Sequence, residues 1–256
     1  LAITIPQAGY LITAYALGVV AGAPTLVSLV AKRPPRSVLI WFMLMFAVFN
    51  ALSALAPNFG LMLVSRFLAG LPHGAFFGVG AVVASRLADE GKVAAAMATM
   101  FTGLTLANVI GVPLGTYLGH NFSWRLVFLI VAAIGLLTAI SLRQWVPVIE
   151  ARPSAGFRKD LGIFRKPGLW MALAITSIGT GGFFAWFSYI APLLTDLSRF
   201  APSQIPMIMT VVGVGMTVGV VAGGRLADRF APIHAIAILL VTMTALLLMN
   251  GMFASS

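Results

Sequence analysis

The 256-residue chain contains no cysteine and few charged side chains. Without cysteine it has no disulfide framework and no thiolate metal site. Charged residues make up 9% of the chain, whereas a soluble protein carries about a quarter. Hydrophobic residues make up 60%, and the mean hydropathy is +1.03. This composition excludes a soluble globular domain and predicts an integral membrane protein.

The apolar residues fall into eight continuous runs, each long enough to cross about 30 Å of hydrocarbon as a helix. Continuous runs of this length favour transmembrane helices, which satisfy all their backbone hydrogen bonds internally. We therefore predict an all-α membrane protein. The predicted spans are 8–30, 38–56, 61–83, 93–117, 126–146, 168–190, 204–224 and 233–253.

The basic residues concentrate in every second connection between these spans. The first, third, fifth and seventh connections hold 13 of the 16 Lys and Arg residues, and the opposite connections hold only Arg125 and Arg199. The remaining one, Arg66, lies inside a span. By the positive-inside rule, the side with 13 basic residues faces the cytoplasm. The net charge of +10 is thus read as an orientation signal, and no nucleic-acid partner is expected.

The longest and most charged connection, 147–167, separates five spans from three. Its prolines prevent a continuous helix through it. We predict an N-terminal helical half over 1–146, a central cytoplasmic loop over 147–167 and part of a C-terminal half over 168–256. The segment Gly18-Val-Val-Ala-Gly22 recurs as Gly219-Val-Val-Ala-Gly223, which weakly favours two related halves.

Arg66 and His73 lie in the same apolar span, Arg66 about five residues from its outer end and His73 near the membrane midplane. A guanidinium at membrane depth is costly unless it meets a partner or water. Seven residues separate the two, which places them on one helical face. Arg66 either serves function or extends to the interface along its stem. His73 is either a protonatable or substrate-contacting group or a packing histidine.

Glycines at helical spacing predict close helix packing at several seams. Gly111-Val-Pro113-Leu-Gly115 combines such a glycine face with a proline that bends the helix. Asn108, one turn earlier, is positioned to hydrogen-bond across the bundle. With Arg66 and His73 it is a candidate for proton coupling or for lining a central cavity.

We expect most of the aromatic residues near 183–189 to face lipid or to form an aromatic belt at the membrane interface. Trp186 and Tyr189 are alternative candidates for lining a substrate cavity, together with Phe77. Asp228 ends a span in Gly224-Arg-Leu-Ala-Asp228-Arg229. There a carboxylate can pair with arginine or cap a neighbouring helix, so Asp228 is predicted to act as a conformational latch.

An enzyme is not expected. The sequence has no phosphate-binding glycine-lysine loop, no metal-spaced His/Glu cluster and no nucleophile with a base partner. A non-transporting membrane scaffold or receptor is the alternative from another class. Arg66 and His73 on one face favour a transporter over a scaffold, which has no need of polar groups at membrane depth.

Several of these motifs resemble those of the major facilitator superfamily along essentially the whole chain. Arg66-Phe-Leu-Ala-Gly70 resembles its motif B, Gly111 to Gly115 its antiporter motif C, and Gly224 to Arg229 its motif A. Leu71-Pro-His-Gly-Ala-Phe-Phe-Gly78, Phe122-Ser-Trp-Arg125 and Phe184-Ala-Trp-Phe-Ser-Tyr189 are similar to the arabinose efflux permease group within the drug:proton antiporters.

The resemblance implies a major facilitator bundle of twelve helices in two pseudo-symmetric halves of six. The eight spans seen here then correspond to family helices 2 to 9. It also implies alternating access around a central cavity in the bacterial inner membrane. Export of a small molecule, a sugar or an amphipathic drug, would be driven by proton influx. We expect a monomer without a cofactor, with substrate, protons and lipid as its partners.

The resemblance also implies roles for individual residues. Arg66 takes the motif B role in proton coupling, and Asp228 and Arg229 take the motif A role of stabilising one gating state. In the first half Ala31 stands at the carboxylate position of motif A, with Lys32 and Arg36 as its basic part.

All six acidic residues of the chain fall in connections or at helix ends. The proton site is therefore supplied by a helix before Leu1, or by His73, or the visible chain does not couple transport to protons.

Overall fold

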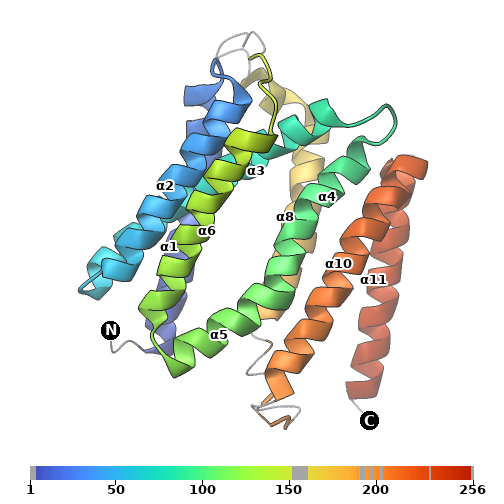
Figure 1. Cartoon of the computed structure of the whole chain (residues 1–256). Coiled ribbons are helices and arrows are strands. Elements are labelled where there is room, and N and C mark those ends of the chain that lie inside the picture. The colour runs from blue at the N-terminus through green and yellow to red at the C-terminus, as the bar shows by residue number, and fades with distance from the viewer. Residues whose placement is uncertain are drawn as a thin grey trace.

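The computed structural model describes residues 4–151, 161–188, 190, 194–195, 199–201, 204–230 and 232–254. Long helices lie side by side in it (Figure 1). Their bounds are α1 Ile5–Val30, α2 Pro35–Leu55, α3 Phe59–Leu87, α4 Val93–Leu106, α5 Val112–Asn121, α6 Trp124–Trp145, α8 Pro167–Ser188, α10 Ile205–Arg229 and α11 Pro232–Ala254. A π-helical turn η1, Ala107–Gly111, joins α4 to α5, and a 3₁₀ turn η2, Leu161–Arg165, precedes α8.

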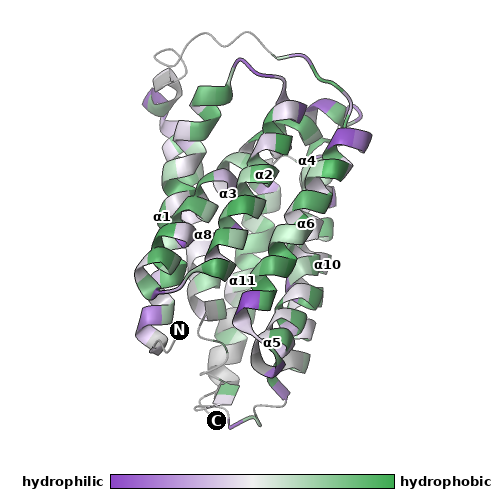
Figure 2. Cartoon of the chain, turned by 60° about the vertical axis from the view of Figure 1, so that its left-hand side comes forward, coloured by the Kyte–Doolittle hydropathy of each residue, from purple (hydrophilic) through white to green (hydrophobic). Residues whose placement is uncertain are grey.

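Each of the eight predicted spans coincides with a helix or a run of helices. The predicted span 93–117 is the run α4, η1 and α5. Within the described residues, six stretches are long and apolar enough to cross a membrane. Figure 2 shows their hydrophobic middles, with hydrophilic residues at the ends and in the connections. The chain is therefore a multi-pass membrane protein, as predicted.

Local sequence explains where several helices begin. Thr4 forms a reciprocal capping box with Gln7 before α1. The side chains of Asn58 and Ser123 accept hydrogen bonds from Leu61 N and Arg125 N at the starts of α3 and α6. These caps satisfy backbone donors that a helix leaves unpaired at its N-terminus.

The predicted bend in the fourth span lies at η1. Pro113 has no backbone N–H, so it cannot complete the regular ladder of an α-helix. The chain forms π-helical hydrogen bonds just before it, with Val112 N donating to Ala107 O. Helix α5 consequently leaves the direction of α4 (Figure 1). π-Turns of this kind are a recognised cause of helix kinks.

Helices α1 and α3 approach so closely that only glycine fits between them. A Cβ atom at Gly18 would lie 2.1 Å from Phe67 O, and one at Gly22 would lie 2.0 Å from Leu71 O. On the opposing helix, a Cβ at Gly70 would lie 2.2 Å from Tyr15 O. The predicted glycine seam is therefore present in the first half.

The other predicted glycine seams are looser in the described structure. A Cβ at Gly215 or Gly219 would meet nothing within 4 Å, and Gly111 and Gly115 have ordinary van der Waals space. The tight glycines of α10 are Gly213, against Val109, and Gly224, whose added Cβ would lie 2.4 Å from Ala98 Cβ. The identical five-residue segments Gly18–Gly22 and Gly219–Gly223 thus have different surroundings.

Helix α2 is fixed to α3 and α6 by packing and by polar contacts. Val38 and Phe42 of α2 pack with Ala75 of α3 in the buried core. At one end Arg125 donates to Ala56 O, and at the other Arg36 donates to Arg143 O. Each arginine satisfies a carbonyl near the C-terminal end of a neighbouring helix.

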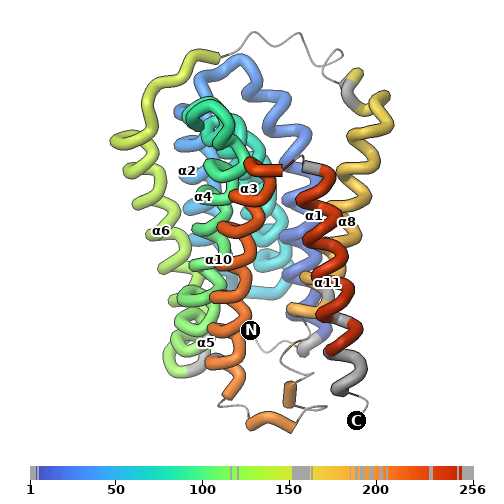
Figure 3. Tube along the Cα trace, turned by 90° about the vertical axis from the view of Figure 1, so that its right-hand side faces the viewer, coloured from blue at the N-terminus to red at the C-terminus, as the bar shows by residue number. Residues whose placement is uncertain are grey.

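Helices α4 and α10 also pack side by side, as Figures 1 and 3 both show. This contact joins segments on either side of the connection 147–167. The C-terminal ends of α1, α3, α6 and α10 lie at one end of the bundle, and we call this the basic end (Figure 1). The division at 147–167 into two halves stays a prediction.

The glycine seam yields a first prediction. Gly22→Ala will place a methyl group against Leu71 O and destabilise the folded protein by about 1–3 kcal/mol, a typical cost of overpacking. Thermal unfolding of the detergent-purified full-length protein measures the effect. Gly103→Ala is the matched control, because a Cβ at Gly103 meets nothing within 4 Å and alanine favours the helix. Equal melting temperatures for the two variants would contradict the seam.

Candidate functional site

Tyr15 of α1 contacts both Arg66 and His73 of α3. The Arg66 Cζ atom lies 4.2 Å from the centroid of the Tyr15 ring. The Tyr15 hydroxyl lies 2.7 Å from His73 Nδ1, within hydrogen-bond distance. All three side chains are half-buried. The two polar residues that sequence places on one helical face are thus joined through a tyrosine of another helix.

In the hydrogen bond between Tyr15 and His73, either residue can be the donor. The phenol donates when Nδ1 is unprotonated, and accepts when Nδ1 carries a proton. The contact therefore persists in either tautomer by rotation of one hydroxyl hydrogen. This is the property expected of a pair that gains and loses a proton without rearranging its heavy atoms.

Aromatic rings from three helices surround His73. Its ring centroid lies 5.0 Å from that of Phe77 and 6.5 Å from that of Phe46. Phe77 in turn stacks on Phe101 of α4, with ring centroids 5.5 Å apart and ring planes 14° apart. Phe77, predicted to line a substrate cavity, therefore lies beside His73.

The charge of Arg66 meets aromatic faces and no carboxylate among the described residues. Its second ring contact is Phe128 of α6, at 5.5 Å from Cζ. The described acidic residues, Asp89, Glu90, Glu150 and Asp228, all lie in connections or at a helix end. Cation–π contacts offset part of the cost of placing a charge at membrane depth, but they leave the guanidinium N–H donors free to bind an anion or water.

Other predicted site residues lie apart from this group. Asn108 makes a local hydrogen bond, its amide donating to Leu104 O one turn earlier in the same helix run, at 2.9 Å. Its role in the central cavity stays a prediction. Trp186 packs against Phe183 of its own helix, with ring centroids 6.2 Å apart. Tyr189 lies outside the described residues.

Asp228 caps a helix that is more than 130 residues away in sequence. Its two carboxylate oxygens accept hydrogen bonds from Ala94 N and Ala95 N, at 2.9 and 2.8 Å. These amides belong to the first turn of α4, which has no side-chain cap from Lys92. Of the two roles considered for Asp228, the structure has the helix cap. Arg229, the last residue of α10, follows it directly.

Lys32 lies in the turn between α1 and α2, and Arg36 lies in the first turn of α2, both at the basic end. Lys32 is exposed, whereas half-buried Arg36 donates to Arg143 O. Ala31 supplies no carboxylate to either of them. The first-half turn therefore has no counterpart of the Asp228 cap among the described residues.

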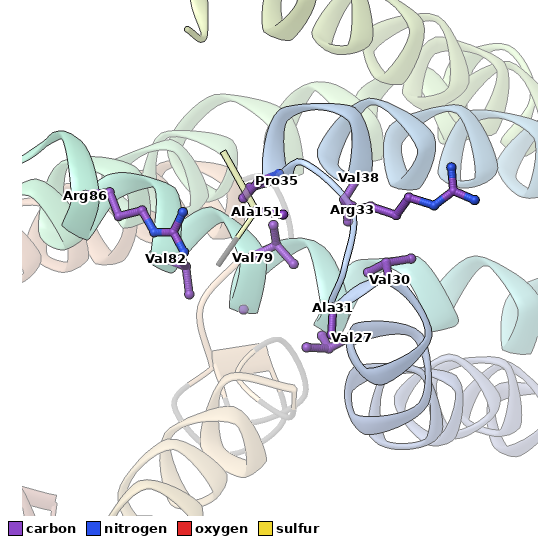
Figure 4. A pocket seen from close by; sticks show the side chains of 11 residues that line it. Val27, Val30, Ala31, Arg33, Pro35, Val38, Val79, Val82, Arg86 and Ala151 are labelled. Atoms are coloured by element: carbon purple, nitrogen blue, oxygen red, sulfur yellow. The ribbon is translucent and has the colours of Figure 1, made fainter. Parts of the chain in front are cut away.

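A cavity of about 140 Å³ opens at the basic end between α1, α2 and α3 (Figure 4). Ala31 lines it among mainly apolar side chains, with Arg33 and Arg86. Arg86 Nη1 donates to Glu150 O at 2.9 Å, and its buried Nε has no hydrogen-bond partner among the described residues. This cavity contains none of Tyr15, Arg66 and His73.

Tyr15 is the site residue that sequence reasoning missed. It lies 51 residues before Arg66, on a different helix, so no spacing rule relates the two. Composition gave only a weak signal, since Tyr15 is one of four tyrosines and all four lie within predicted spans. A phenol in such a position needs a hydrogen-bond partner.

The sequence profile of the Major Facilitator Superfamily matches residues 1–256, and the chain belongs to this family of membrane transporters. It is 38% identical to AraJ of Escherichia coli K12 over 258 residues, covering 99% of this chain and 66% of AraJ. It is 42% identical to the inner membrane transport protein YdhP of the same organism, covering 89% of this chain and 58% of YdhP.

A chloramphenicol resistance protein of Streptomyces lividans is 32% identical, covering 90% of this chain and 59% of that protein. The chain thus spans about three-fifths of the length of these relatives. Among solved structures, the human organic anion transporter MFSD10 matches with a TM-score of 0.58 at 18% identity, covering 85% of this chain and 56% of that one. This likeness supports the all-helical fold that sequence predicted.

The Asp228 cap yields a second prediction. Asp228→Asn removes the charge and one of the two acceptor oxygens, so the first turn of α4 will open more often. We expect hydrogen exchange of the segment 93–98 in the full-length protein to accelerate by about fivefold, equivalent to ~1 kcal/mol. Mass spectrometry of that peptide measures it.

The matched control for this experiment is Asp89→Asn. Asp89 lies in the connection between α3 and α4, just before the capped turn, and pairs with exposed Lys92, so its loss leaves the amides of Ala94 and Ala95 capped. Unchanged exchange in Asp228→Asn, or equal acceleration in both variants, would show that the carboxylate does not hold α4.

Proposed function

We propose that this chain is the larger part of a secondary active exporter in a bacterial inner membrane. It moves a small molecule, a sugar or an amphipathic drug, by alternating access in exchange for protons. The observation that carries the proposal is the contact of Tyr15 with both Arg66 and His73 at membrane depth. Polar groups joined in this way inside a span mark transport pathways.

His73 is the group proposed to carry the proton. Among these three side chains, histidine is the residue type whose ordinary pKa lies near neutral pH. Because Arg66 and His73 share Tyr15, a change of charge on His73 acts on the position of Arg66. No described carboxylate lies at membrane depth, so the coupling proposed here runs through the histidine and the phenol.

The aromatic surroundings of His73 support an amphipathic substrate. Phe46, Phe77 and Phe101 offer ring faces, and His73 and Arg66 offer hydrogen-bonding groups beside them. Binding sites for small molecules commonly combine an apolar wall with a few convergent polar groups. A relative in Streptomyces lividans is a chloramphenicol resistance protein, which makes chloramphenicol a suitable first probe.

Asp228 is proposed to hold one conformation of the transporter. Its carboxylate joins the end of α10 to the start of α4 at the basic end. This contact forms only while the two helices lie side by side. Breaking it favours a state in which they separate, so the cap biases an equilibrium between two arrangements.

A third prediction tests transport directly. The full-length protein in inverted vesicles will move chloramphenicol, a fluorescent cationic dye or arabinose only while a proton gradient is imposed. Arg66→Ala will reduce this transport roughly tenfold or more, because it removes a cation–π contact of ~1–2 kcal/mol and the only described charge at that depth.

Arg199→Ala serves as the control for Arg66→Ala, since it removes an exposed arginine from a connection. Gradient-independent movement would rule out proton coupling. Absence of movement for all three probes would favour the scaffold alternative.

A fourth prediction separates the two contacts of Tyr15. Tyr15→Phe keeps the ring beneath Arg66 but loses the hydroxyl bonded to His73, a loss worth ~1 kcal/mol. Proton-driven transport will fall about fivefold, while Tyr15→Leu, which also removes the ring, will fall further. Tyr10→Phe is the control, because Tyr10 is 60% exposed on the same helix. Equal rates in Tyr15→Phe and wild type would exclude a role for the hydroxyl.

A further inference from the structure

The start of α2 combines an exposed indole, three arginines and two surface hollows. Trp41 is 66% exposed. One hollow, of about 370 Å³, is lined by Arg33, Ser37 and Trp41 among others. A second, of about 330 Å³, is lined by Arg36, Arg143, Ser37 and Trp41 among others. The two hollows therefore share Ser37 and Trp41 and each contains arginine.

These arginines have no acidic partner among the described residues. The ion pair that the described residues form is Lys92 with Asp89, in another connection. Arg36 donates one N–H to Arg143 O. This contact holds its guanidinium at the end of α6, where Arg143 lines the same hollow. Arg33 also lines the cavity beside Arg86, and Figure 4 shows its guanidinium extending away from Arg86. Two groups of positive charge thus flank Trp41 without compensation.

The face below Trp41 is that of a lipid-exposed helix. Val48, Leu52 and Leu55 continue an exposed apolar stripe along α2 from Trp41. An indole at the end of such a stripe, next to arginines, is the arrangement found where a helix crosses from hydrocarbon to the headgroup region. A phospholipid bound in the hollows would therefore place its phosphate beside the arginines and its acyl chains along the apolar stripe.

We propose that this surface binds an anionic phospholipid with two phosphates, diphosphatidylglycerol, with one phosphate in each hollow. Charge complementarity carries the assignment, because two adjacent hollows, each lined by arginine, match two phosphates joined through one glycerol. Basic pockets at the cytoplasmic ends of transmembrane helices are suited to such headgroups. The indole of Trp41 lies between the phosphates, and the Ser37 hydroxyl serves either one.

Native mass spectrometry of delipidated full-length protein with added lipid tests the proposal. One diphosphatidylglycerol will bind per chain, at least tenfold more tightly than phosphatidylglycerol, which has a single phosphate. Arg33→Gln combined with Arg143→Gln will weaken its binding about 30-fold, from two lost surface charges. Arg165→Gln combined with Arg199→Gln removes the same charge elsewhere and will leave binding unchanged.

Trp41→Ala is a second variant that removes an exposed side chain and is expected to weaken binding while the melting temperature stays constant. Equal affinity for the two lipids would overturn the two-phosphate assignment. Displacement of the lipid by an equal concentration of inorganic pyrophosphate would show a site for free anions and overturn the lipid assignment. Binding unaffected by loss of Arg33 and Arg143 would place the lipid elsewhere.

Discussion

The close approach of α1 and α3 is the contact on which the candidate site depends. Gly18, Gly22 and Gly70 leave no side-chain atoms between the two backbones, so the carbonyl oxygens of one helix lie where a Cβ of the other would stand. Tyr15 lies one turn before Gly18, and its carbonyl is the atom that excludes a Cβ at Gly70. This register brings one phenol against both Arg66 and His73. A bulkier seam would move α1 outward and separate the three groups.

Charged side chains find different partners at the basic end and within the membrane. At the basic end, Asp228 satisfies two helix donors, and arginines bind carbonyl oxygens near helix ends. Within the membrane, the described structure gives Arg66 only ring faces. Such contacts offset part of the desolvation cost and leave hydrogen-bonding capacity unused. In our proposal that unused capacity favours a transport pathway over a scaffold, which gains nothing from a charge held this way.

Hydropathy was sufficient to predict the helices, because continuous apolar runs in lipid admit few other structures. The seven-residue spacing likewise placed Arg66 and His73 on one face. Tyr15 was not predictable, because sequence periodicity describes one helix and says nothing of which residue on a neighbour comes opposite. Asn108 shows a related limit, since its amide donates to a carbonyl one turn away, a local contact that periodicity does not predict. The repeated Gly-Val-Val-Ala-Gly segment is a packed seam in α1, whereas in α10 Gly219 faces open space and Gly223 makes an ordinary contact.

We propose that His73 and its neighbours line a water-accessible space within the membrane. Cysteine accessibility tests this proposal, because these 256 residues contain no cysteine to interfere. In a cysteine-free background of the full-length protein, Phe77→Cys will react with a hydrophilic methanethiosulfonate, and added substrate will slow the reaction. Val48→Cys, on the exposed apolar stripe of α2, will stay unreactive. Equal inertness of the two cysteines would contradict the claim and leave Arg66 and His73 as packing residues.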